Sequence, residues 1–292
     1  MILGAMALGF FATSCSNDDD NGITSPVESS LTVNLTGLEA LGADFVYEGW
    51  IIVDGAPVST GRFTSVAFPQ TFSVNTAQLN AATQFVLSIE PTVDPDPAPA
   101  PTKLLAGAFS GDNATVNSTG IVGDFSASWG KYILATPTDT DMTNEESGVW
   151  FLDNATMPPT VGLGLPELPD GWKYEGWAVI DGTPLSTGTF TKVAATDEMA
   201  PYSGPEALPM PNGADGFFPG EDFLENTPAG MTFPLDLKGK TIVVSVEPYP
   251  DNSPAPFTLK PLAHMVPTNA ANHTPISMGA GPVQSLTGSV SR

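Results

Sequence analysis

The sequence predicts an all-β protein made of two related β-sandwich-like halves with long loops rich in proline and glycine. The main observation is an internal repeat without gaps, in which residues 47–63 recur as residues 174–190, 127 positions further along the chain. A second matching pair follows, residues 86–91 and 243–248. The repeated unit is much longer than a solenoid repeat, so two similar halves are expected rather than a stacked array.

Composition points to the same fold class. The 29 glycines and 29 prolines divide the 292 residues into short segments, and no window shows sustained apolar recurrence at helical spacing. Charged residues make up only 14% of the chain, yet the net charge is −23. So acidic a protein is not expected to bind nucleic acid, or an anionic membrane surface, by bulk electrostatics.

The N-terminal segment has the features of an export signal. Residues 1–14 are apolar and uncharged, and they are too short to span a bilayer. Small residues precede Cys15, the only cysteine, which resembles the lipidated residue of bacterial lipoproteins. The acidic run at 16–21 resembles the surface-export signal of Bacteroidota lipoproteins. We expect a signal peptide at 1–14, a lipidated tether at 15–29, and attachment to the outer membrane or cell surface.

Each copy of the repeat has the pattern of a β-hairpin. Residues 47–53 are mainly aromatic and β-branched, as strands favour. Asp54-Gly55 and Asp181-Gly182 supply the positive φ angles that a tight hairpin turn needs. Gly49 and Gly176 are predicted to mark a β-bulge or a close approach of backbone.

A glutamate and a tryptophan are repeated inside each hairpin. Trp50 and Trp177 are large apolar groups, and the favoured interpretation places them in the core. With Glu48 and Glu175 beside them, they are also candidate residues of a duplicated binding site. The packing interpretation is preferred over the binding site, because residues that occur in both copies usually serve the packing that both copies share.

The repeat sets the expected domain boundaries. We expect the first β half over residues 30–165 and the second over residues 166–292, with an insertion at about 191–240. Further strands are expected at residues 30–35, 85–90, 103–107, 132–136, 148–152 and 285–290. Residues 94–101 are expected to form an extended surface loop, 111–126 a crossing dominated by loop, and 157–172 a passage rich in proline and glycine that joins the two copies.

The insertion is dense in proline, glycine and aromatic residues. Loops of this length inside compact domains are usually functional or disordered, and the aromatic residues favour a packed loop. Phe217, Phe218 and Phe223 are therefore candidate binding residues, since aromatic side chains are enriched in interfaces. The alternative is that these three rings fill a small core within the loop.

Four short motifs occur in a fixed order: Tyr-Glu-Gly-Trp, Ser-Thr-Gly-x-Phe, Ser-Ile-Glu-Pro and Pro-Ala-Pro-Thr-Lys-Leu-Leu-Ala-Gly. This order resembles the extracytoplasmic domain of anti-sigma-K factors over residues 47–107, and more loosely over residues 174–262. The resemblance implies an all-β domain on the outer side of a membrane, without enzymatic activity. Direct binding of a sigma factor is not expected, because the sequence contains neither an apolar stretch near twenty residues nor a His/Cys zinc motif.

No catalytic, metal or cofactor motif is recognised. His264 and His273 have no metal-ligand spacing, and nucleophile-elbow and phosphate-loop patterns are absent from the sequence. Each histidine is expected to be a hydrogen-bonded sheet or loop residue. We therefore predict that the protein is not an enzyme and requires no cofactor.

Two acidic patterns remain as alternatives. Glycosidases use paired carboxylates, for which the candidate pairs are Glu48/Glu90 and Glu175/Glu247. Calcium is held by carboxylate and carbonyl oxygens. The candidate calcium loops contain Asp94/Asp96, Asp251/Asn252/Ser253 and Asp215/Glu221/Asp222. None has the spacing of a known calcium loop, so solvated acidic loops are preferred and no metal site is predicted.

The expected function is a non-catalytic binding, interaction or sensory module on the cell envelope. Its expected partners are the membrane, through the lipid at Cys15, and an unidentified envelope protein or glycan, but not nucleic acid. The alternative is a glycan-binding or carbohydrate-active lipoprotein, which requires Trp50 and Trp177 to be exposed beside open carboxylates. A third hypothesis is a purely structural envelope component.

Overall fold

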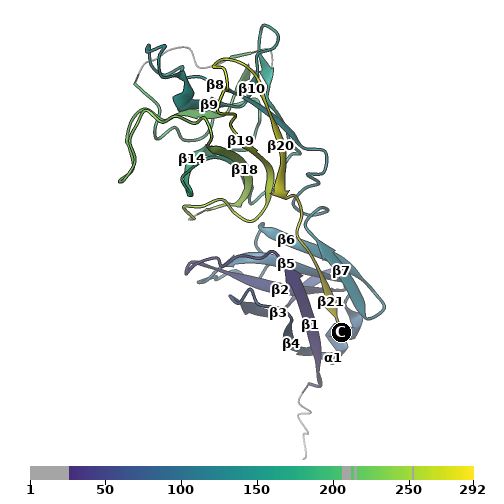
Figure 1. Cartoon of the computed structure of the whole chain (residues 1–292). Coiled ribbons are helices and arrows are strands. Elements are labelled where there is room, and N and C mark those ends of the chain that lie inside the picture. Colours follow the sequence, from purple (N-terminus) through teal and green to yellow (C-terminus); the bar gives the residue numbers. More distant parts are fainter. Residues whose placement is uncertain (1–25, 206–211, 214–215, 252) are drawn as a thin grey trace, which may run out of the picture.

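The computed structural model describes residues 26–205, 212–213, 216–251 and 253–292. The predicted signal peptide, Cys15 and most of the predicted tether lie outside the described residues. The described chain forms two nearly closed antiparallel sheets, one in each lobe of the molecule (Figure 1). Its one α-helix is α1 (Thr76–Ala81), so the predicted all-β class is confirmed for this part of the chain.

The first sheet has eight strands in the order β3-β2-β5-β6-β7-β21-β1-β4. These strands are β1 (Glu28–Thr36), β2 (Phe45–Val53), β3 (Ala56–Phe63), β4 (Gln70–Asn75), β5 (Gln84–Pro91), β6 (Lys103–Ser110), β7 (Asn113–Asn117) and β21 (Thr287–Ser291). The end strands β3 and β4 approach each other, and the rings of Phe63 and Phe72 lie 5.5 Å apart between them. The sheet therefore curls almost into a barrel.

The second sheet has the main order β14-β13-β18-β19-β20-β8-β9-β17, with β12 beside β8. These strands are β8 (Trp129–Leu134), β9 (Gly148–Trp150), β12 (Leu163–Gly164), β13 (Trp172–Ile180), β14 (Thr183–Phe190), β17 (Gly220–Asp222), β18 (Thr241–Pro248), β19 (Lys260–Met265) and β20 (Ile276–Val283). A 3₁₀ turn, η1 (Glu145–Ser147), precedes β9. Two short ribbons are β10 (Leu152–Asp153) with β11 (Thr160–Val161), and β15 (Asn212–Gly213) with β16 (Gly216–Phe217).

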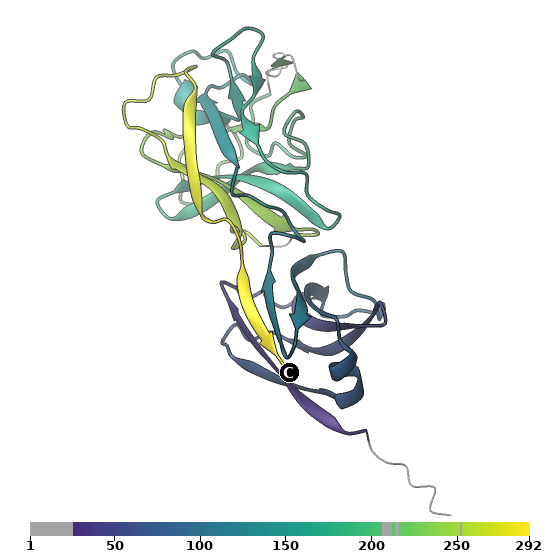
Figure 2. The ribbon, with the colours of Figure 1, turned by 90° about the vertical axis from the view of Figure 1, so that its right-hand side faces the viewer.

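Sheet membership does not follow the boundary expected at residues 165 and 166. Strands β8 and β9 precede that boundary but pair in the second sheet, whereas β21 ends the chain and pairs between β1 and β7 of the first. The chain thus passes from the lobe that contains β20 to the lobe that contains β21, as the yellow segment shows (Figure 2). Val290 of β21 is fully buried there. Strand pairing is non-local, so a repeat in the sequence does not reveal the partner of a strand outside it.

Residues 111–126, expected to be a loop, contain β7. Ala114 and Val116 of this strand are buried and alternate with more exposed residues, as in a strand with one face on the core. The polar composition of the segment hid this short alternation. The prediction that loop dominates this segment did not identify β7.

The repeated hairpins have the same register. In β2 and β3, Tyr47 pairs with Phe63, and 127 residues later Tyr174 of β13 pairs with Phe190 of β14. The register shifts immediately after Gly49 in the first hairpin and after Gly176 in the second, which confirms the predicted bulges.

Steric crowding explains the glycine at each bulge. A Cβ atom at Gly49 would lie 2.5 Å from Thr60 Oγ1, and one at Gly176 would lie 2.1 Å from Thr187 Oγ1. The turns also agree, because Asp54 and Asp181 both have φ of 51°. Local chemistry thus gives both hairpins the same geometry.

The two halves pack against each other. Buried apolar residues from both sheets form one contiguous cluster, which includes Tyr47 and Leu104 of the first sheet and Tyr174 and Leu262 of the second. A hydrogen bond of 2.8 Å from Thr258 Oγ1 to the carbonyl of Gly37 also joins them. Burial of each large apolar side chain contributes roughly 1.5–3 kcal/mol, so the shared core is the main stabilising feature.

Candidate functional site

The repeated Glu and Trp belong to two clusters of polar side chains, one in each sheet. The first cluster consists of Glu48, Trp50, Ser59, Ser88 and Glu90, and the second of Glu175, Trp177, Ser186, Ser245 and Glu247. The indole Nε1–H of Trp50 donates to Ser88 Oγ at 2.8 Å, and that of Trp177 donates to Ser245 Oγ at 2.7 Å. Each serine hydroxyl in turn donates to the glutamate two residues later.

The glutamate that ends each Trp–Ser–Glu series of hydrogen bonds, Glu90 or Glu247, also holds the loop that follows its strand. Glu90 accepts the backbone N–H of Ala100 at 2.8 Å, and Glu247 accepts that of Phe257 at 2.9 Å. A carboxylate that accepts several hydrogen bonds can remain buried, because the bonds replace those lost from water. Burial nevertheless raises the pKa of Glu247 to about 8. It also raises the pKa of Glu90 above its ordinary value.

The second glutamate of each cluster is held by the return strand of the hairpin. Ser59 Oγ donates to Glu48 at 2.5 Å, and Ser186 donates to Glu175 in the same way. Burial raises the pKa of Glu175 to about 7. The tryptophans are just as enclosed, because Trp50 is 4% and Trp177 2% exposed. Buried indoles cannot form a sugar-binding platform, so the glycan alternative loses its main support.

The two clusters differ at the position opposite the first glutamate. Arg62 stands there in the first half, and its Nε lies 3.0 Å from Glu48 Oε2. The same guanidinium lies 3.8 Å from Asp94 and donates to the carbonyls of Pro91 and Thr92. A positive group therefore links two carboxylates and a loop.

In the second half, Thr189 occupies the register position of Arg62 and pairs opposite Glu175. The acidic residues are kept, because Glu247 and Asp251 have the same four-residue spacing as Glu90 and Asp94. Carboxylate oxygens of Glu175, Glu247 and Asp251 lie within 4.8 Å of one another. Sequence reasoning named these three residues separately but did not combine them. The signal was the replacement of arginine by threonine between two otherwise matching motifs.

Two cavities adjoin the acidic group of the second half. One, of about 270 Å³, lies between the halves, with Leu41 and Phe45 on one side and Phe257, Glu247 and Asp251 on the other. The other has a volume of about 570 Å³, and its lining includes Glu175, Asp251, Glu198 and Tyr202. Glu175, Glu247 and Asp251 therefore line hollow space, although the two glutamates are almost fully buried.

The insertion places its three phenylalanines differently. Phe218 and Phe223 are fully buried, whereas Phe217 is 46% exposed. The ring of Phe223 lies 5.6 Å from Tyr202 and 6.0 Å from Phe233, in a small aromatic core. Two of the three candidate contact residues thus pack inside the protein, and only Phe217 presents its ring to solvent.

The acidic residues of the insertion also serve the fold. Asp222 accepts hydrogen bonds from Thr138 Oγ1 at 2.6 Å and Trp150 Nε1 at 2.7 Å, and Glu221 accepts from Ser203. Burial raises the pKa of Asp222 to about 6 and that of Glu221 to about 7. Asp215, the remaining member of this candidate calcium loop, lies outside the described residues.

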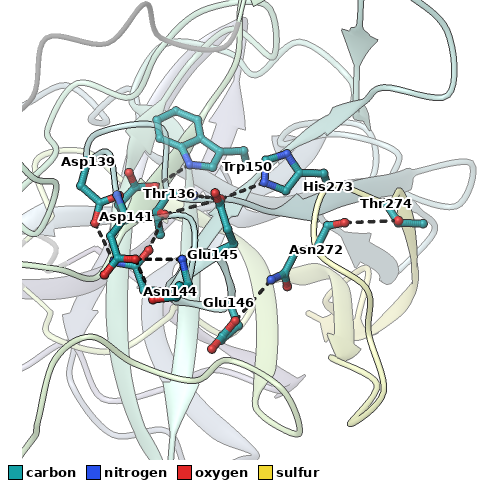
Figure 3. Close-up of polar contacts among 12 residues, drawn as sticks. Thr136, Asp139, Asp141, Asn144, Glu145, Glu146, Trp150, Asn272, His273 and Thr274 are labelled. Atoms are coloured by element: carbon teal, nitrogen blue, oxygen red, sulfur yellow. Dashed lines mark hydrogen bonds and ion pairs between the residues drawn. The ribbon is translucent and has the colours of Figure 1, made fainter.

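The two histidines have separate hydrogen-bond partners. His273 Nε2 lies 2.9 Å from Glu145 Oε2, beside the polar chain that links Thr136, Asn144 and Asp139 (Figure 3). His264 Nδ1 lies 2.9 Å from the hydroxyl of Tyr132. These contacts agree with the interpretation of both histidines as hydrogen-bonded sheet and loop residues.

Part of the chain matches a known protein family. Residues 21–104 match the family described as anti-sigma-K factor rskA, C-terminal. No curated protein and no solved structure matches the chain. The matched segment includes Glu48, Arg62, Glu90 and Asp94, and hence the charged part of the first half. It is related to a domain that is extracytoplasmic in anti-sigma factors, which indicates an extracytoplasmic location.

The search for membrane-spanning helices was negative. Within the described residues, no helix is both long enough and apolar enough to cross a bilayer.

Proposed function

We propose that this protein is a non-catalytic, extracytoplasmic binding module anchored by a lipid on Cys15. The match of residues 21–104 to the outer domain of anti-sigma-K factors carries the proposal. The repeated glutamates support it, because hydrogen bonds from serines and from loop backbone engage them in holding the fold. The lipid at Cys15 rests on the lipoprotein-like sequence that surrounds it.

We further propose that the second half is a divergent copy of the matched domain. The common strand register and the common Trp–Ser–Glu hydrogen bonds support this origin. A third shared bond lies at the other end of the hairpin. Tyr47 Oη donates to the carbonyl of Glu39 at 2.8 Å, and Tyr174 Oη donates to that of Pro166 at 2.6 Å.

The proposed contact surface lies on the second half. Tyr249, at the cavity between the halves, is 54% exposed, and Phe217 of the insertion is 46% exposed. Aromatic side chains are enriched among the residues that anchor protein interfaces. The partner is proposed to be an envelope protein or glycan.

Site-specific photo-crosslinking in intact cells tests the binding role. A crosslinking amino acid is placed at Tyr249 or Phe217, with Met157, 81% exposed on another loop, as the control position. The proposal predicts one defined adduct at the first two positions and none at Met157. It is contradicted if neither position yields an adduct, or if Met157 yields the same ones.

Anchoring is tested separately by the variant Cys15→Ser. The proposal predicts that wild-type protein incorporates a labelled fatty acid and sediments with membranes. The variant should lose the label and become soluble after cell disruption. A variant that keeps both the label and the membrane association would contradict lipid attachment at this residue.

A further inference from the structure

The first half shows how the repeated acidic group is neutralised. Glu48 and Asp94 lie on either side of the Arg62 guanidinium, at 3.0 and 3.8 Å. Two backbone carbonyls complete the surroundings of the positive group. Carboxylate and carbonyl oxygens thus surround a cation that the chain itself supplies, and the third acid, Glu90, lies in the same cluster.

The second half has the same three acidic residues but lacks the arginine. Glu175, Glu247 and Asp251 correspond to the three acids, and Thr189 corresponds to Arg62. The residues equivalent to Pro91 and Thr92, whose carbonyls accept from the guanidinium, are Pro248 and Tyr249. Every potential ligand of the first half therefore has an oxygen-bearing counterpart in the second.

The two buried glutamates of the second half have no counterpart of the ion pair that Arg62 forms with Glu48. No lysine or arginine of the described residues forms an ion pair with Glu175 or Glu247, which are 4% and 1% exposed. Lys173, which stands where the first half has Val46, pairs with Glu198. Lys260 donates to the carbonyl of Phe257, just as Lys103 donates to that of Ala100. Since this lysine is common to both halves, it does not compensate for the missing arginine.

We propose that Glu175, Glu247 and Asp251 bind a calcium ion, which takes the place that the Arg62 guanidinium has in the first half. Calcium binds six to eight oxygens at about 2.3–2.6 Å, so oxygens on opposite sides of the ion lie about 5 Å apart. The three carboxylates, with oxygens within 4.8 Å of one another, fit that sphere. The absence of nitrogen and sulfur ligands favours a hard cation over zinc or copper.

The two cavities give the ion access to the site. Glu247 and Asp251 line the cavity between the halves, and Glu175 and Asp251 line the larger one beside it. Water in these cavities would supply the remaining ligands. Bound calcium would tie the loop after β18 to the hairpin, as Arg62 ties the loop after β5 to its own hairpin.

Calcium titration of the full-length protein, freed of metal by chelation, tests the proposal by isothermal calorimetry at pH 7.5. We expect one ion per chain with a dissociation constant of about 0.1–1 mM, as in extracellular calcium modules. Asp251→Asn should weaken binding at least tenfold. The matched variant Asp94→Asn, in the first half, should leave the affinity unchanged.

A second variant, which introduces an arginine and retains all three acids, tests the proposal even if a variant that removes an acid fails to fold. Thr189→Arg should abolish calcium binding and make the melting temperature equal with calcium and with chelator. Wild-type protein should melt at a higher temperature with calcium than with chelator. The proposal is overturned if the wild type shows no saturable binding, because protons then neutralise the acids. It is equally overturned if binding persists in both Asp251→Asn and Thr189→Arg. Neither result bears on lipid anchoring or on the crosslinked partner.

Discussion

Glu48 and Glu175 lie at the same place in two hairpins of the same register, and each accepts a hydrogen bond from the serine opposite. Only Glu48 also meets a guanidinium, that of Arg62. The Trp–Ser–Glu chain is therefore the part of the cluster that the fold requires, since both halves keep it. The charge partner varies between the halves, and the difference in function is expected there.

The halves also differ in their load of buried acid. Glu48 and Glu90 are the buried carboxylates of the first sheet. The described part of the lobe with the second sheet buries Glu145, Glu175, Glu221, Asp222 and Glu247. A buried acid without a cation resists ionisation, so the second half should govern the response of the protein to pH and to cations.

The largest expected effect tests whether the Trp–Ser–Glu side chains stabilise both halves equally. Trp50→Ala and Trp177→Ala should each lower the free energy of unfolding by about 3–5 kcal/mol, because each removes a buried ring and leaves a cavity. Chemical denaturation measures the loss. A loss below about 1 kcal/mol in one half alone would show that the two clusters are not equivalent. Trp→Phe at the same positions separates the lost ring from the lost N–H donor.

The next effect concerns the charge partner itself. Arg62→Met should cost about 1–3 kcal/mol, because it leaves the nearly buried carboxyl group of Glu48 without its ion-pair partner. The cost stays below that of a fully buried pair, since the Arg62 side chain is 34% exposed. Thr189→Val is the matched control and should change stability by about 0.5 kcal/mol or less. Equal losses in the two variants would contradict a special role of Arg62.

A pH-dependent prediction concerns Asp197 in the insertion of the second half. Burial raises the pKa of this carboxyl to about 8, and its Oδ1 has no hydrogen-bond partner among the described residues. The folded state thus holds a proton that the unfolded state releases above pH about 4. The contribution of Asp197 to stability is full below that pH and is lost as the pH rises towards 8.

The variant Asp197→Asn should remove this dependence. Its melting temperature should fall less than that of the wild type between pH 5 and pH 8, and it should exceed the wild-type value at pH 8. Asp112→Asn, at an exposed position, is the control and should follow the wild type. A variant whose melting temperature falls as steeply as that of the wild type would show that Asp197 is ionised in the folded protein.

The smallest effect is expected at the exposed ring of the insertion. Phe217→Ala should change the free energy of unfolding by about 0.5 kcal/mol or less, whereas Phe218→Ala, at a fully buried position, should cost about 3–5 kcal/mol. Denaturation of the two variants side by side measures the contrast. A large loss at Phe217 would mean that its ring packs against the protein and is not a free contact surface.

Much of the local structure could be predicted from the sequence. The hairpins, their Asp-Gly turns and the bulges at Gly49 and Gly176 depend on residues close together in the chain, so motif and turn chemistry were sufficient. The partners of β8 and β21 depend on distant segments, which the repeat does not include. For the same reason, Glu48 and Trp50 were recognised as special, but the serine between Trp50 and Glu90 was not.

The acidic group was missed for a related reason. Asp251 was considered only with its neighbours in sequence, and Glu175 with Glu247 only as a possible catalytic pair. Their proximity depends on how the loop after β18 folds back on the hairpin, which sequence spacing does not encode. Aligning Arg62 with Thr189 was possible from the sequence, and that comparison would have indicated a change of charge.

A crystal structure of the full-length protein grown in calcium, with anomalous data collected at a long wavelength, tests the central claim most directly. The account predicts one anomalous peak between Glu175, Glu247 and Asp251, with no peak beside Arg62 in the equivalent place of the first half. The claim is that a metal ion neutralises the acids of the second half, as Arg62 does in the first. No peak among these three carboxylates, or equal peaks in both halves, would contradict it.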